Sequence, residues 1–232
     1  MLKVLASASV AAALIGGAAG ASVIDFETLP GGGMPSEGPI ASPLTYALGT
    51  NQLSFSSTVG LGIAEVGGSP PFGFFPEDTP DPATAFGQFF LTTQLAETSD
   101  LTVSYLNPVT GFNFDLGDVD GRQDDPSGGT QVETFTIEVR DTSNAVLDTI
   151  VVTGDTPGAG DQSVYNVSYS SGSANIGSIF IEATVPSTRK IGIAFDNFDP
   201  DSPTPVPLPH TLPLLMAGFG AFAFVRRRKR AA

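Results

Sequence analysis

The stretch VETFTIEVRDTSNAVLDTIVVT, residues 132–153, decides the fold class of this chain. In its first half, apolar side chains take every second position, at Phe135, Ile137 and Val139, and polar ones fill most of the positions between. Successive side chains of a β-strand point to opposite faces, so the alternation predicts a strand with one buried face. A second strand follows at 145–153, and the polar residues Asp-Thr-Ser-Asn at 141–144 predict a hairpin turn.

Similar patterns recur along the chain and predict eleven short strands, at residues 23–28, 52–57, 61–66, 88–92, 101–105, 111–116, 132–140, 145–153, 163–169, 176–183 and 190–195. No sustained helical period appears among them. Short strands with turn-rich links predict an all-β fold, a two-sheet antiparallel β-sandwich of jelly-roll-like type.

Two Gly- and Pro-rich segments, residues 29–43 and 67–87, are predicted to be irregular loops. The second loop carries four phenylalanines, Phe72, Phe74, Phe75 and Phe86. Aromatic side chains on a loop can form a binding surface, but we expect them to close one end of the sandwich as a satellite cluster.

Segments with the features of topogenic signals bracket this domain. Residues 1–21 combine an early Lys3, an Ala-rich apolar run and a small-x-small end, which predicts a signal peptide. Residues 206–225 carry no charge apart from the titratable His210, and a basic block follows at once: Arg226, Arg227, Arg228, Lys229 and Arg230. Flanking cations stay cytoplasmic, so we predict a transmembrane helix at 206–225 and an exported β-sandwich domain at 22–198, joined by a Pro- and Asp-rich spacer at 199–205.

The C-terminal tail, residues 206–232, resembles a known family of sorting signals. It begins with Val206, Pro207, Leu208 and Pro209, continues as an apolar segment and ends in the basic block. This order is similar to the PEP-CTERM class of bacterial signals, in the variant that reads Val-Pro-Leu-Pro-Ala, with His210 in place of the usual Ala. The resemblance implies recognition by an exosortase, cleavage, and delivery to the surface or matrix. A plain C-terminal membrane anchor is the alternative.

Charge and composition exclude several kinds of function. All 24 acidic residues but only four of the ten basic ones lie in residues 22–205, which gives that segment a formal net charge of −20. Such a surface repels nucleic acid and anionic lipid and attracts divalent cations. The chain has no Cys, and its one His lies in the tail, so the domain holds no thiol nucleophile, no Ser-His-Asp triad and no His-ligated metal.

Two groups of carboxylates are candidate ligands for a structural calcium ion. Asp118, Asp120 and Asp124 surround a glycine in a tight acidic turn, which suits a hard cation. The second group joins Asp25 and Glu27 near the start of the domain to Asp196 and Asn197 at its end, with Asp199 nearby. The IDFET opening and AFDNF closing look like those of jelly-roll carbohydrate-binding modules, whose first and last strands often share a calcium. The alternatives are a solvated acidic turn and edge-strand charges that block aggregation.

These patterns favour a non-enzymatic protein exported by a Gram-negative bacterium, held transiently in the inner membrane and delivered to the cell surface or the extracellular polysaccharide matrix. Its expected partners are an exosortase-type enzyme and the membrane, not nucleic acid. A carbohydrate-binding module for exported polysaccharide is the alternative, and a polysaccharide hydrolase is the third possibility.

Overall fold

A computed structural model of the chain describes residues 23–66, 86–94, 98–117, 119, 123–124, 130–160, 163–184 and 194–201. Its elements are the strands β1 (Gly38–Ile40), β2 (Leu44–Leu48), β3 (Asn51–Ser56), β4 (Leu61–Glu65), β5 (Phe89–Thr93), β6 (Thr98–Val109), β7 (Gly111–Gly117), β8 (Gln123–Asp124), β9 (Thr130–Gln131), β10 (Thr134–Asp141), β11 (Val146–Thr153), β12 (Val164–Ser170), β13 (Ile176–Thr184) and β14 (Ala194–Asp201). The predicted signal peptide, sorting motif, membrane helix and basic tail lie outside the described residues. Within them, no helix is long and apolar enough to cross a membrane.

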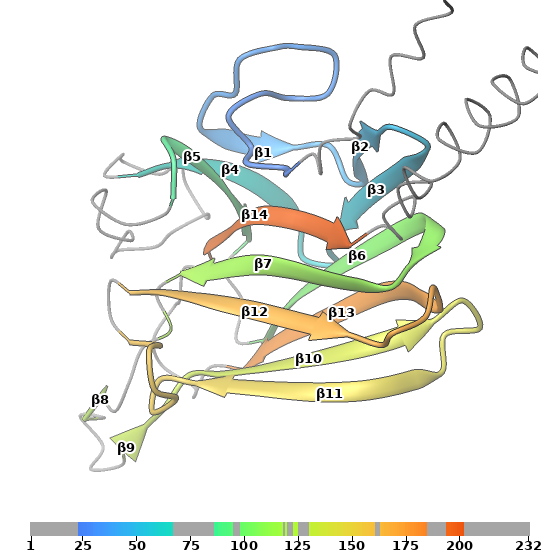
Figure 1. Cartoon of the computed structure of the whole chain (residues 1–232). Helices are drawn as coiled ribbons and strands as arrows, with labels where there is room; N and C mark the ends of the chain where they lie inside the picture. Colours follow the sequence, from blue (N-terminus) through green and yellow to red (C-terminus); the bar gives the residue numbers. More distant parts are fainter. Residues whose placement is uncertain are drawn as a thin grey trace, which may run out of the picture.

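The strands form two six-stranded sheets that face each other (Figure 1). The first sheet has the order β1-β4-β5-β14-β7-β12, and the second has the order β11-β10-β13-β6-β3-β2. Strand pairs are antiparallel in both sheets, and β8 pairs with β9 in a small separate ribbon. The predicted two-sheet antiparallel sandwich is confirmed.

The core lies between the two sheets and consists of the side chains that alternate inward. The predicted inward positions are buried: Phe112, Phe114 and Leu116 on β7, Phe135, Ile137 and Val139 on β10, and Ile179, Ile181 and Ala183 on β13. Phe195 of β14 is also buried, whereas Ile191 and Ile193, predicted on the same strand, lie outside the described residues. Burial of one face per strand, the basis of the fold prediction, holds for β3, β6 and β10 of the second sheet, whereas β4, β5 and β7 of the first sheet are buried on both faces.

The start of the domain departs from the prediction. Residues 23–28 do not form a strand; Ile24 makes one isolated antiparallel bridge, to Phe198. The reason is Phe26, whose φ of 53° is left-handed and interrupts the extended backbone. The prediction of which side chains of this segment face the core is nevertheless correct, because Ile24 and Phe26 are buried while Asp25 is exposed.

Other boundaries also differ from those that the sequence suggested. The segment 29–43, predicted to be irregular, contains β1, and the unpredicted β2 follows it. Both strands are short, and neither shows a clear alternation of apolar and polar side chains. At the other end β14 runs to Asp201, so residues 199–201 of the predicted spacer pair with β7.

The predicted turn at 141–144 is confirmed, and the Asp141 side chain organises it. Its Oδ1 accepts hydrogen bonds from the Ser143 hydroxyl at 2.7 Å, the Ser143 N–H at 2.8 Å and the Ala145 N–H at 2.9 Å. These bonds, the Ser143 hydroxyl first, lower the pKa of Asp141 below its ordinary value. Asn144 adopts a left-handed φ of 68°, which asparagine tolerates well.

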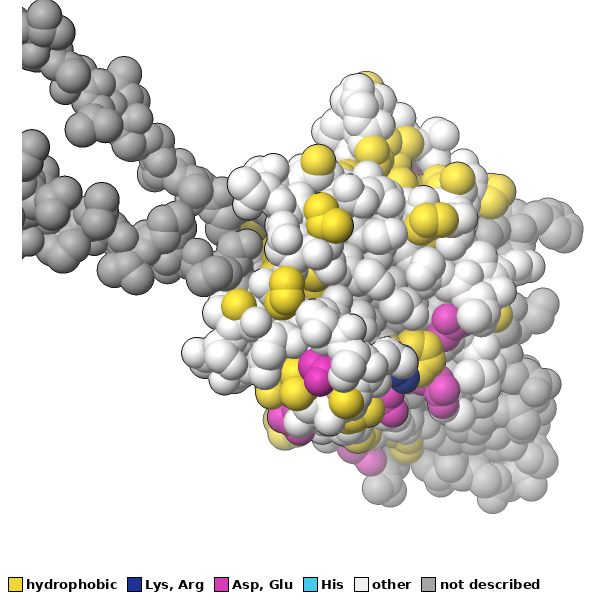
Figure 2. Space-filling model, turned by 90° about the vertical axis from the view of Figure 1, so that its right-hand side faces the viewer, with side chains coloured by type: hydrophobic (Ala, Val, Ile, Leu, Met, Phe, Trp, Pro, Cys, Tyr) yellow, Lys and Arg dark blue, Asp and Glu magenta, His cyan; other side chains and the backbone are white. Residues whose placement is uncertain are grey.

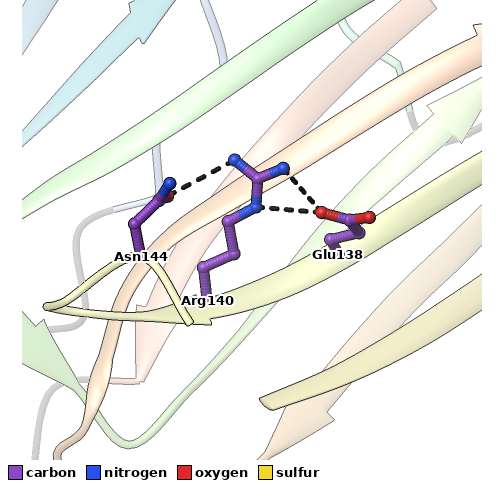
Figure 3. A network of polar contacts seen from close by, with 3 residues as sticks. All are labelled: Glu138, Arg140 and Asn144. Atoms are coloured by element: carbon purple, nitrogen blue, oxygen red, sulfur yellow. Dashed lines mark hydrogen bonds and ion pairs between the residues drawn. The ribbon is translucent and has the colours of Figure 1, made fainter. Parts of the chain in front are cut away.

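Arg140, the one basic residue in the described part of the chain, is fully engaged on the outer face of the second sheet. Its Nε lies 2.9 Å from Glu138 Oε2, a terminal nitrogen lies 2.6 Å from the same oxygen, and the other terminal nitrogen donates to Asn144 Oδ1 at 3.3 Å (Figure 3). The guanidinium also stands 4.5 Å from the centre of the Phe180 ring. Acidic side chains gather low on the face in Figure 2, where the dark blue basic group also lies.

A small apolar cluster lies outside the main core, against the first sheet. It consists of Ala64, Phe86, Phe90 and Ala194, with the rings of Phe86 and Phe90 edge to face at 5.9 Å. Phe86 thus belongs to a satellite cluster, but the cluster lies on the outer face of β4, β5 and β14 rather than at one end of the sandwich, where it was expected. Phe72, Phe74 and Phe75 lie outside the described residues.

Gly177 is predicted to resist substitution because the β10–β11 turn packs against its backbone. A Cβ at this position would lie 2.8 Å from Thr142 Cα and from Thr142 N, at a point where the β6–β13 register shifts. Overpacking of this kind costs about 1–3 kcal/mol. We expect Gly177→Ala to lower the melting temperature of the protein by several degrees in thermal unfolding. Gly33→Ala is the matched control, because nothing lies within 4 Å of its added Cβ; equal midpoints for the two variants would contradict the packing argument.

Candidate functional site

The most unusual polar group in the described part of the chain is the carboxylate of Asp196. It sits on β14, near the middle of the first sheet, and follows Phe195, so its side chain points away from the core. Asp196 is 0 % exposed, and neither of its carboxylate oxygens makes a hydrogen bond. Buried polar side chains nearly always have a partner, so this exception requires an explanation.

Burial raises the pKa of Asp196 to about 8, because the charged form is poorly solvated there. The backbone N–H groups of Asn197 and Gly87 lower this pKa in part, although neither makes a hydrogen bond of good geometry. The negative charges of Asp25 and Asp115 raise it further. Two neighbouring carboxylates, those of Asp25 and Asp115, thus act on Asp196 at this point of the sheet.

Asp115 lies directly beside Asp196, because β7 and β14 place the two residues opposite each other. Amide groups hold its carboxylate on both sides. Asn166 Nδ2 donates to Oδ1 at 2.8 Å, and Asn197 Nδ2 donates to Oδ2 at 2.9 Å. Asn197 therefore orients a neighbouring carboxylate, and the left-handed φ of 53° at Asn197 marks a local break in the β7–β14 register.

Asp25 reaches the same region because the start of the domain pairs with β14. Ile24 N–H donates to the Phe198 carbonyl at 2.9 Å, and Phe198 N–H donates to the Ile24 carbonyl at 3.0 Å. Asp25 is the next residue along and is exposed, while one of its carboxylate oxygens accepts the Glu27 N–H at 3.2 Å. The predicted meeting of the domain's first and last segments is therefore present.

Glu27 serves a different purpose from its neighbours. Its carboxylate accepts the backbone N–H of Phe89 at 3.0 Å and also that of Gln88, at the start of β5. It lies against Gly87, where a Cβ would collide with it. The carboxylate of Glu27 thus fastens the N-terminal segment to β5.

Tyr46 also belongs to the site, although nothing in its sequence context pointed to it. Its hydroxyl is buried without a hydrogen-bond partner, and its ring packs edge to face on Phe26 and Phe55. Burial raises the pKa of Tyr46, and the charges of Asp25 and Asp196 add to the effect. The only sequence signal was a tyrosine in a short apolar segment, which fits an ordinary half-buried sheet position equally well.

Most of the second predicted group of ligands lies outside the described residues. Asp118 and Asp120 lie outside the described residues, and Asp124 is placed only as part of β8, opposite Thr130. Asp199, on the other hand, has one buried carboxylate oxygen without a hydrogen bond and pairs with Asn113. In the described part of the chain, no three acidic side chains lie near enough to hold a metal ion by themselves.

Comparison with known proteins identifies the tail. Residues 205–230 match the PEP-CTERM protein-sorting motif, so the resemblance of the VPLP segment is confirmed, and the match is consistent with an exosortase substrate. The sorting signal implies an exported protein that is anchored in the membrane for a time. Comparison with curated proteins gives no significant match.

Solved structures similar to the domain are distant. TmCBM61 in complex with beta-1,4-galactotriose has a TM-score of 0.34 and 11% identity, covering 63% of this chain and 86% of that one. The CBM22-1 xylan-binding domain from Paenibacillus barcinonensis Xyn10C has a TM-score of 0.33 and 12% identity, covering 78% and 94%. The enzymatically active domain of bacteriophage CBA120 tailspike protein 4 has a TM-score of 0.34 and 15% identity, covering 65% of this chain but 19% of that one. These likenesses concern the fold alone.

The raised pKa of Asp196 predicts a dependence of stability on pH when no metal is present. The folded protein keeps a proton that the unfolded chain loses near pH 4, so stability falls as pH rises from about 4 to about 8. We expect the melting temperature, measured in chelator from pH 5 to 9, to fall across this range. The titratable groups around Asp196 are Asp25, Glu27, Asp115 and Tyr46. The Asp196→Asn variant isolates the contribution of Asp196, because the melting temperature of this variant should depend less on pH. Asp148→Asn removes an exposed carboxylate on β11 and should leave the slope unchanged; a slope that survives Asp196→Asn would assign it to another group.

Proposed function

We propose that this chain is a non-enzymatic exported protein, which an exosortase-type system sorts to the cell surface or the extracellular polysaccharide matrix of a Gram-negative bacterium. The observation that carries the proposal is the PEP-CTERM protein-sorting motif at residues 205–230. The motif follows directly after a folded β-sandwich whose last strand ends at Asp201. In this proposal the sandwich is the part that is delivered, and the tail is the sorting signal that is cleaved off.

The side chains of the domain support a role without catalysis. The chain has no Cys, and its single His210 lies within the sorting motif. Several carboxylates, the groups that serve as acids or bases in many enzymes, instead hold the fold here: Glu27 fastens the start of β5, Asp115 binds two amides, and Asp141 organises a turn. A general acid or base must reach a substrate proton, and these groups are committed to neighbouring amides.

Carbohydrate binding is the second candidate, and the outer face of the second sheet favours it. Hydroxyl side chains face one another across four strands in the row Thr45, Ser54, Ser104 and Ser178. Phe180 lies on the same face of β13, next to this row. The hydroxyls can hydrogen-bond to a sugar, and the Phe180 ring can stack on one where the Arg140 guanidinium, 4.5 Å from the ring centre, is displaced. A glycan array on the exported protein, compared with its Phe180→Ala variant, separates this candidate from a protein that only resides in the matrix.

The sorting proposal predicts loss of the tail in the native host. We expect intact-mass analysis of material from the cell surface to show a chain that ends near residues 207–210 and lacks the basic block at 226–230. Replacement of both Pro207 and Pro209 by Ala should abolish this processing, because the enzyme is expected to recognise the motif.

Thr204→Ala, in the segment between the last strand and the motif, is the matched control and should be processed normally. Recovery of only full-length, membrane-embedded protein from the native host would reduce the tail to a plain anchor.

A further inference from the structure

The strand β11 combines an unpaired edge with exposed apolar side chains. It is the last strand of the second sheet and pairs only with β10 in the described part of the chain (Figure 1). Six large apolar side chains are exposed in the described residues, and three of them lie on β11: Val146, Leu147 and Val151, which are 53 %, 37 % and 54 % exposed. An edge of this kind is a template on which another strand can pair.

The three other sheet edges are protected against such pairing. β1 and β2 are short, with three and five residues, and neither exposes a large apolar side chain. β12 has seven residues, but its exposed side chains are polar: Asn166, Ser168 and Ser170. β11 has eight residues, is rich in the β-branched types that favour strands, and carries one charged side chain, Asp148. It is therefore the edge that is open to a partner strand.

The backbone hydrogen bonds show which groups of β11 face this open edge. The N–H of Gly154 points toward β10, because it donates to the carbonyl of Glu133 at 3.3 Å. The direction of hydrogen bonding alternates along a strand, so the N–H groups of Thr149, Val151 and Thr153 point away from β10.

Two of these three N–H groups are already satisfied by nearby side chains. Thr149 N–H donates to Asp148 Oδ1 at 2.8 Å, and Thr153 N–H donates to Thr156 Oγ1 at 2.9 Å. The N–H of Val151 has no partner among the described residues. A second strand can therefore begin to pair at Val151 without breaking a hydrogen bond, and pairing further along exchanges the two side-chain bonds for bonds between strands.

We propose that β11 pairs with β11 of a second copy of this chain, antiparallel and around a two-fold axis at Val151. The N–H and C=O of Val151 then bond to those of the partner's Val151, as in a hydrogen-bonded antiparallel pair. Ile150 stands opposite the partner's Val152, and Thr149 stands opposite the partner's Thr153. Cross-strand pairs of β-branched side chains stabilise a sheet, and the two-fold axis provides each of them twice.

Asp148 favours this axis over the neighbouring ones. An axis at Asp148 itself would place two carboxylates directly opposite each other, which destabilises a strand pair. An axis at either of the next two residues would place Asp148 against an apolar side chain of the partner. With the axis at Val151, Asp148 stands opposite the partner's Gly154, which has no side chain.

A second copy fits this edge better than a partner of opposite charge. Residues 22–205 have a formal net charge of −20, so a basic partner is drawn to the carboxylates of the domain. β11 offers one carboxylate, which is bound to Thr149 N–H, so its edge is recognised through main-chain groups and apolar side chains. One strand edge is a small contact, and the dimer is therefore of the weak class that forms and dissociates with concentration. This inference does not depend on the sorting or the carbohydrate proposals.

The first test is cysteine cross-linking, which is specific because the chain has no Cys of its own. In the full chain in mild detergent, Val151→Cys brings two Cα atoms to about 5.5 Å at the axis, within reach of a disulfide. Mild oxidation should give a linked dimer on a non-reducing gel. Ser168→Cys, at an exposed position of the edge strand β12, is the matched control and should remain monomeric.

The second test measures self-association of the full chain by analytical ultracentrifugation. Val151→Pro removes the N–H at the axis but no bond to β10, and proline is tolerated where the N–H of an edge strand faces solvent. Dimerisation should weaken by about tenfold or more, because two hydrogen bonds are lost. Ser168→Pro makes the same change at the open edge of β12 and should leave dimerisation intact. Without substitution, the dimer should strengthen as sodium chloride is raised, because salt screens the repulsion between two acidic copies.

Distinct results overturn the proposal. Sedimentation as a monomer at every concentration and salt level would leave β11 as an unpaired edge. Association that survives Val151→Pro would belong to another surface, and association that weakens with salt would indicate oppositely charged contacts. A stronger cross-link in Asp148→Cys or Thr149→Cys than in Val151→Cys would contradict the axis. If Val151→Pro does not fold, the comparison of the cysteine variants decides alone.

Discussion

The pair of hydrogen bonds between Ile24 and Phe198 is the contact on which the arrangement of the candidate site depends. It brings the first segment of the domain against β14, although 173 residues separate the two in sequence. The rings of Phe26 and Phe198 then pack against each other and against Phe55 of the opposite sheet. The same pairing places Asp25 near enough to Asp196 for its charge to raise the Asp196 pKa, so the arrangement of the carboxylates depends on this contact.

The fold could be predicted from sequence wherever alternation was sustained. Phe112, Phe114 and Leu116, for instance, mark the core-facing positions of β7. The prediction failed where elements were short or where backbone geometry overrode the pattern. The alternation of Ile24, Asp25 and Phe26 suggested a strand, but the left-handed Phe26 ends it, and no feature of the sequence announces a positive φ at phenylalanine. Strand β2 was missed because five residues carry too little periodicity.

The candidate site was predictable only in outline. Acidic residues at both ends of the domain suggested that Asp25 and Asp196 would meet, which requires only that the first and last segments pair. The closeness of Asp115 could not be anticipated, because it depends on the register of β7 against β14. Tyr46 was missed for a related reason, because its position near Asp25 and Asp196 depends on how one sheet packs on the other. Glu27 fitted the pattern of a ligand, but the structure shows it bound to backbone N–H groups of β5.

The pairing of Ile24 with Phe198 has a topological consequence as well. The chain enters and leaves the sandwich at neighbouring points, so a short linker could join the two ends into a circle without disturbing either sheet. New ends could then be opened at the exposed turn 141–144, whose hydrogen bonds are local to the hairpin. Such a permuted chain would place the N-terminal segment and β14 in one continuous hairpin. The two ends of the described domain thus lie side by side on the sandwich, so its strands form an almost closed circuit.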